Sequence, residues 1–155
     1  IGNNAFQNCR SLASVTIPDS VTSIEAETFR GCTSLASVTA PNSVTSIGVG
    51  AFDSCTSLAS VVIPNRVTSI EEWAFYNCTS LASIFLPNGL TVESARIPNT
   101  ATQVRYSLDA DKITITEIIL GTDKEKVDIP DTISGCTVVA VAEAYHPYVG
   151  NHTQK

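Results

Sequence analysis

The stretch AFDSCTSLASVVIP, residues 51–64, decides the fold because the chain repeats it. Close copies follow one another at a fixed step, the distance from Phe6 to Phe29, so that single residue types form columns along the sequence. The columns are Phe6, Phe29, Phe52 and Phe75; Cys9, Cys32, Cys55 and Cys78; Leu12, Leu35, Leu58 and Leu81; Pro18, Pro41, Pro64 and Pro87. A fixed period of about 20–50 residues is typical of a solenoid, in which each turn buries its apolar face against its neighbours.

Each unit is predicted to hold one short strand. Val15 and Ile17 are two residues apart, so a strand points both side chains to one face, and Pro18 then starts a turn. The segment AFQNC (5–9) is predicted to form one helical turn on the opposite side. We therefore expect an α/β repeat solenoid that is mostly strand and irregular chain, with short helical segments.

The repeated pattern A-F-x-x-C-x-S-L-x-S-V-x-I-P over residues 1–92 resembles the BspA-like leucine-rich repeats of the treponemal type, whose unit has the same length. Thr28 in place of Ala and Ala40 in place of Ile depart from the pattern. The resemblance implies a curved, right-handed solenoid with a parallel sheet. It also implies a cell-surface or secreted protein that binds other cells or host matrix proteins such as fibronectin or fibrinogen.

The periodic pattern ends after Val92. We expect four repeats over residues 1–92, a degenerate repeat or linker over 93–105, a divergent β-rich element over 106–145 and a tail over 146–155. The segment KITIT (112–116) alternates with period two and predicts a strand. Since the chain lacks Met and starts inside a motif, we interpret it as a fragment of a longer repeat array whose targeting segment lies elsewhere.

The charge balance excludes some partners. The net charge is −6, with an isoelectric point near 4.7, which argues against binding to nucleic acid or to an anionic membrane surface. No run approaches the roughly 20 apolar residues of a membrane span. A protein ligand is therefore the expected partner, and the pattern leaves the oligomeric state open.

The cysteine column has three interpretations: buried thiols, disulfides or a metal site. Successive cysteines lie a whole repeat apart and give no close C-x-x-C pair, and the repeats contain no His, which disfavours zinc. Stacked side chains run parallel rather than towards each other, which disfavours disulfides. Four buried thiols are favoured, and Cys136, outside the column, is predicted to be the exposed one.

No catalytic site is predicted, nor any cofactor or metal. The Ser, Thr and Cys side chains of the repeats lack a nearby base, and His146 and His152 fall in the expected tail. The sequence DAD (109–111) lacks the remainder of a calcium loop, and GVG (48–50) lacks the remainder of a phosphate loop. The chain is therefore predicted not to be an enzyme.

Candidate protein-binding residues are those expected to face outward. Two columns of the predicted strands alternate with the core: Ser14, Ser37, Ser60 and Ser83, and Thr16, Thr39, Val62 and Phe85. The second becomes apolar towards Phe85, which either forms an exposed corner or packs under residues 93–105. Trp73 and Tyr76 stand where other repeats carry polar residues or Gly, and predict a second aromatic patch on the helical side.

Ala40 interrupts the expected core column Ile17, Ala40, Ile63 and Leu86. We expect it to be a packing defect in the solenoid. Together these features favour a non-catalytic binding or adhesion module, and the alternative is a passive spacer that displays another domain.

Overall fold

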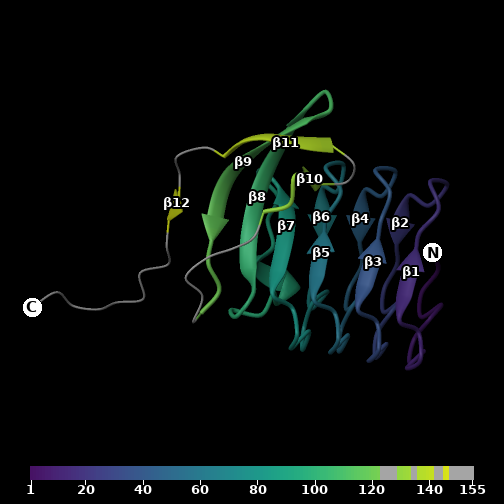
Figure 1. The fold of residues 1–155 in the computed structure, drawn as a ribbon. Coiled ribbons are helices and arrows are strands. Elements are labelled where there is room, and N and C mark those ends of the chain that lie inside the picture. Colours follow the sequence, from purple (N-terminus) through teal and green to yellow (C-terminus); the bar gives the residue numbers. More distant parts are fainter. Residues whose placement is uncertain (123–128, 134–135, 142–144, 147–155) are drawn as a thin grey trace, which may run out of the picture.

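The computed structural model describes residues 1–122, 129–133, 136–141 and 145–146. These residues form a β-solenoid of about five turns, so the predicted repeat solenoid is confirmed. Figure 1 shows the turns stacked side by side, with the strands of successive turns running nearly parallel.

Each of the first three turns contributes two short strands, and the fourth contributes one. The first strands are β1 (Ser14–Thr16), β3 (Ser37–Thr39), β5 (Ser60–Val62) and β7 (Ser83–Pro87), and the second are β2 (Ser23–Ile24), β4 (Ser46–Ile47) and β6 (Ser69–Ile70). Pairing is parallel, and Cα partners such as Ser14 and Ser37 or Ile24 and Ile47 are separated by the length of one repeat. The sequence period is therefore the register of the sheets.

The sheet formed by the first strands is interrupted between β3 and β5. Strands β1 and β3 form one two-stranded sheet, whereas β5 pairs with β7 in a separate, larger sheet. The N–H of Ala59 still donates to the carbonyl of Ala36 at 3.3 Å. The N–H of Ile17 donates to the carbonyl of Thr39 in the next turn, and the N–H of Ile63 donates to the carbonyl of Phe85. Ala40, at the equivalent position, makes no such backbone bond within the described chain.

The segments opposite these strands are tight turns rather than the predicted helical segments. Hydrogen bonds run from residue i to i−3, as from Cys9 to Phe6 and from Cys32 to Phe29. Two positions in each of the first four turns adopt left-handed backbone angles, which interrupt any helix. One position is occupied by Asn4, Glu27, Gly50 and Trp73, and the other by Asn8, Gly31, Ser54 and Asn77. The described residues include a single helical element, the 3-10 helix η1 (Glu93–Ala95).

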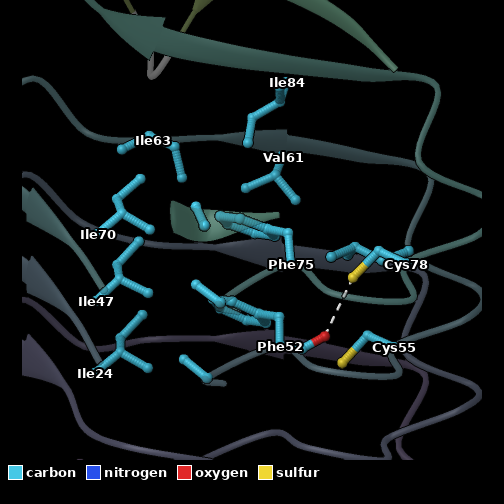
Figure 2. Packing of buried hydrophobic residues seen from close by; sticks show 14 of the residues in the cluster. Ile24, Ile47, Phe52, Cys55, Val61, Ile63, Ile70, Phe75, Cys78 and Ile84 are labelled. Carbon is cyan, nitrogen blue, oxygen red and sulfur yellow. Dashed lines mark hydrogen bonds between the residues drawn. The ribbon is translucent and has the colours of Figure 1, made fainter. Parts of the chain in front are cut away.

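The core is a set of columns that run along the solenoid axis. The four Phe rings stack with centroids 5.4–5.5 Å apart and nearly parallel planes. Figure 2 shows Phe52 and Phe75 between the column Ile24, Ile47 and Ile70 and the cysteines. Because each ring is covered by the ring of the next turn, burial in this core depends on stacking.

The cysteine column also binds one turn to the next. The thiols of Cys32, Cys55 and Cys78 donate to carbonyl oxygens of Phe6, Phe29 and Phe52, at 3.0, 3.2 and 3.1 Å respectively. The dashed line in Figure 2 marks the last of these bonds. A residue of this size with a weak donor therefore packs in the core and contributes an inter-turn hydrogen bond as well.

The solenoid ends in a β-rich element. Strand β8 (Thr102–Asp109) pairs in parallel with β7 and in antiparallel with β9 (Lys112–Ile119), which confirms the strand predicted at 112–116. Strand β8 crosses the expected domain boundary at 105/106. Strands β11 (Cys136–Val141) and β12 (Tyr145–His146) both pair with β9, and β10 (Thr132–Ile133) pairs with β11. His146, expected in the tail, thus belongs to a strand, and His152 lies outside the described residues.

A second core covers one face of β7, β8 and β9. Its buried members are Phe85, Val104, Tyr106, Ile113, Ile115, Ile118, Leu120 and Ile133. The hydroxyl of Tyr106 reaches past β7 and donates to the carbonyl of Ile63 at 2.6 Å. This buried bond links the C-terminal element to the third turn.

Candidate functional site

The sheet face carries most of the outward columns predicted from sequence. Ser14, Ser37, Ser60, Thr16 and Thr39 are exposed. Ser83 and Val62 are half-buried, and the Ser83 hydroxyl lies 3.5 Å from that of Ser60. The exposed part of this face is therefore dominated by small hydroxyl groups, which form few bonds among themselves.

The exposed corner proposed for Phe85 is wrong. Phe85 is only 4% exposed, because it packs in the second core with side chains of β8, β9 and β10. Val104, the strand neighbour of Phe85, belongs to the segment expected to cover it, whereas most of the covering side chains follow residue 105. Phe85 is therefore a core residue and is not available to a ligand.

A groove of about 500 Å³ opens where the sheet is interrupted. Thr16, Thr39 and Val62 line it from three successive turns, together with Val38 and Ala40. Its remaining lining residues are Ile17, Asp19, Pro41 and Asn42. The groove thus brings together three of the predicted site residues.

Ala40 explains the position of the groove. Its column neighbours Ile17, Ile63 and Leu86 are almost fully buried, whereas Ala40 is half-buried and lines the groove. A methyl group cannot fill the space that an isoleucine fills in the adjacent turns. The predicted packing defect is therefore open to the surface and forms part of a concave feature.

A second hollow, of about 430 Å³, lies on the opposite, turn-rich side. Trp73 and Tyr76, predicted as an aromatic patch, are 55% and 56% exposed and both line it. Val49 and Gly50 line it as well, as do the charged residues Glu27, Arg30, Asp53 and Arg96. Sequence reasoning missed these six, although they fall mainly in the same variable columns as the two aromatic residues.

Four cysteines of the column were predicted to be buried thiols, and three of them are buried in the core and chemically unreactive. Cys32, Cys55 and Cys78 are buried, and burial raises the pKa of each thiol, for Cys78 to about 12. Protonated thiols at neutral pH are poor nucleophiles and poor metal ligands. None of the five cysteines forms a disulfide.

The prediction for Cys9 is wrong, because that residue is exposed. Cys9 belongs to the first turn of the described residues, and the inter-turn contacts of this turn are made with the second turn. Cys136, predicted to be the most exposed thiol, is half-buried against the second core.

Among the described residues, no group of three or more His, Cys, Asp and Glu side chains has the arrangement of a metal site. In the same part of the chain, no helix has the length and apolar character needed to cross a membrane.

Comparison with known families identifies one family that matches most of the chain. The family described as BspA type leucine rich repeat region matches residues 1–114, in six copies. The chain belongs to this family. The match extends past Val92, where the strict repeat ends, into the turn that contains β8. A BspA-type repeat region supports a protein-binding repeat module.

Three solved structures are similar to this BspA-type chain. A leucine-rich repeat protein from Bacteroides ovatus has 27% identity and a TM-score of 0.45, over 64% of this chain and 31% of that protein. A leucine-rich repeat protein from T. pallidum has 23% identity and a TM-score of 0.46, over 96% of this chain and 63% of the other. A leucine-rich cell surface protein from Faecalibacterium prausnitzii has 24% identity and a TM-score of 0.37, over 86% and 32% respectively.

The chain therefore spans 63% of the T. pallidum protein and about a third of each of the other two proteins. No curated protein matches it.

Proposed function

We propose that this chain is a non-catalytic module of a cell-surface or secreted protein, which binds a protein ligand in the groove on the sheet face. The groove across β1, β3 and β5 carries this proposal, because it gathers outward residues of three turns around one concave feature. Host matrix proteins such as fibronectin and fibrinogen, or the surfaces of other cells, are the proposed partners. BspA-type membership supports protein binding, and the cell-surface description of the F. prausnitzii neighbour is consistent with the proposed location.

The lining suits contact with a protein surface. Asp19 is the one charged residue among the groove's lining residues, so little charge must be desolvated when a partner covers it. Hydroxyls of Thr16 and Thr39 offer adaptable hydrogen bonds, and Val38 and Val62 offer apolar contact. The backbone at Ala40, which lacks the ladder bond made in neighbouring turns, offers a further hydrogen-bonding group.

Binding to immobilised fibronectin, fibrinogen and whole cells tests the proposal. The test protein carries Thr16→Arg and Thr39→Arg, which place two bulky charges on exposed positions of the groove. Ser34→Arg, on an exposed position outside the groove, is the matched control. We expect the double variant to bind at least about tenfold more weakly than the native chain, equivalent to about 1.4 kcal/mol, and the control to bind normally.

Equal binding by all three proteins would contradict the groove as the site. Absence of binding by the native chain to every partner tested would favour the alternative function, a passive spacer that displays another domain.

A further inference from the structure

The hollow on the turn side gathers exposed apolar side chains that the solenoid does not need. The described residues include four exposed large hydrophobic side chains: Val49, Trp73, Tyr76 and Val139. The first three line this one hollow. Exposed aromatic residues that cluster in a concavity are typical of ligand sites, whereas single exposed hydrophobic residues are ordinary.

The hollow exists because Gly50 leaves a gap in a column of side chains. Asn4, Glu27, Gly50 and Trp73 occupy the same left-handed position in four successive turns, with φ between 54° and 59°. A Cβ on Gly50 would lie 3.6 Å from Cγ of Glu27 and 3.7 Å from Cβ of Asp53, so a side chain there would enter the hollow. Glu27 and Trp73, two turns apart in this column, both line the hollow.

Trp73 is in an unfavourable place for a stabilising residue. Its φ of 59° is one that bulky residues rarely adopt, while Asn and Gly adopt it readily. More than half of the side chain stays exposed, so little apolar burial offsets the backbone cost. Since Glu27 and Arg96 take nearly the same φ at the equivalent position, the turn imposes the backbone angle, and stability does not explain why an exposed Trp occupies it.

The polar wall opposite the aromatic residues is held in place. Arg30 bonds Glu27 through Nη1 at 3.2 Å and Asp53 through Nε at 3.1 Å. Side chains of Asn4 and Gln7 donate to the same Oε2 of Glu27, at 3.0 and 2.8 Å. The carboxylates and guanidinium are therefore oriented before a ligand arrives, which reduces the entropy lost on binding.

The charges of the lining cancel. Arg30 and Arg96 balance Glu27 and Asp53, so the hollow has no net charge that favours an anionic or a cationic ligand. It combines the exposed rings of Trp73 and Tyr76 with the fixed donors and acceptors of Glu27, Arg30 and Asp53. Its volume of about 430 Å³ falls within the range of about 300–1,000 Å³ typical of small-ligand sites.

We propose that this hollow binds an uncharged pyranose unit of an oligosaccharide. A pyranose ring presents a C–H face, which packs on Trp73 and Tyr76, and a rim of hydroxyls, which both donate to carboxylates and accept from guanidinium groups. A neutral ligand with both kinds of surface matches the lining, whereas a charged peptide would leave half of the charged groups opposed to it. The site lies apart from the sheet-face groove and does not rest on the protein-binding proposal.

Trp73 makes the test direct, since it is the sole tryptophan of the chain. The native protein is titrated with maltohexaose, cellohexaose, xylohexaose, mannohexaose and chitohexaose, while tryptophan emission and the heat of binding are recorded. We expect a saturable change in emission with at least one of these glycans, and a matching calorimetric affinity.

Two variants locate the site. Gly50→Glu fills the gap with the residue type that occupies the same left-handed position one turn earlier, at Glu27, and it keeps the fluorescent reporter. Trp73→Asn removes the platform and places a favoured residue at the same φ, with binding measured by calorimetry. Both should weaken binding at least about tenfold, or about 1.4 kcal/mol. Asn8→Gly, at the other left-handed column and outside the lining, should leave it unchanged.

Undiminished glycan binding by Gly50→Glu would overturn the assignment of the hollow. No response to any glycan, or a response to a proline-rich decapeptide in place of the glycans, would overturn the sugar as its ligand.

Discussion

Replacing Ala40 with isoleucine should stabilise the solenoid and close the groove. Ala40 lies between Ile17, 3% exposed, and Ile63, 1% exposed, in a column that is otherwise filled by large aliphatic residues. The sheet is interrupted at this turn, and the groove opens beside it. An isoleucine here has neighbours of its own kind above and below it.

The magnitude follows from the added side chain. Isoleucine carries three more carbons than alanine, and each buried carbon contributes about 0.8 kcal/mol, so complete burial would give about 2.4 kcal/mol. Ordering the isoleucine side chain costs about 0.5–1 kcal/mol, and burial is incomplete because the groove is open on one side. A net gain of about 1 kcal/mol remains, which for a chain of this size raises the melting temperature by about 2–4 °C.

Thermal and urea unfolding followed by far-UV circular dichroism measures the change. Ala36→Ile is the matched control, since it makes the same substitution at an exposed position beside the same strand and should change the free energy of unfolding by no more than about 0.5 kcal/mol. A clear fall in the melting temperature of Ala40→Ile would refute the reasoning, because it would mean that residue 40 does not point into the unfilled column. Ala40→Ile should also lower the affinity for any ligand bound in the groove, which links the packing defect to the proposed function.

Three further predictions test the core. Tyr106→Phe should lower the free energy of unfolding by about 1–3 kcal/mol, because the buried carbonyl of Ile63 loses its donor, whereas Tyr76→Phe at an exposed site should have little effect in the same urea titration. Thiol labelling without reductant should modify Cys9 rapidly in the native protein and leave Cys32, Cys55 and Cys78 unmodified until denaturant is added; native labelling of Cys55 at the rate of Cys9 would contradict the buried ladder. Burial raises the pKa of Cys78 to about 12, against the usual 9.0. The contribution of this thiol to stability is therefore complete below about pH 9 and is lost as the pH rises towards 12, at about 1.4 kcal/mol per pH unit. Between about pH 9 and pH 11, the free energy of unfolding of Cys78→Ser should therefore fall less steeply than that of the native chain.

The candidate sites were partly predictable. Thr16, Thr39, Trp73 and Tyr76 were identified because they vary, or face outward, within a periodic pattern. Phe85 obeys the same rule but is buried, and the sequence leaves its exposure open because that depends on side chains of β8, β9 and β10 that pack against it. Val49 and the charged residues around Trp73 were missed, because the contacts between them come from adjacent turns.

The sequence by itself determined the solenoid, its register and its inward columns. A strict period leaves each apolar face without a partner except the same face of the next turn, so the stack and its in-register strands follow directly. It also indicated that the cysteines of the column would not form disulfides.

Tertiary structure alone decided what remains on the surface. Whether Ala40 leaves a closed cavity or an open groove depends on how two strands separate, and the role of the thiols as donors to Phe carbonyls depends on the offset between turns. The turn segments of the first four repeats are not helical, because two positions in each take left-handed angles that stacking imposes on residues as different as Gly50 and Trp73. Such features arise from contacts between turns, so they cannot be inferred from the sequence of a single repeat.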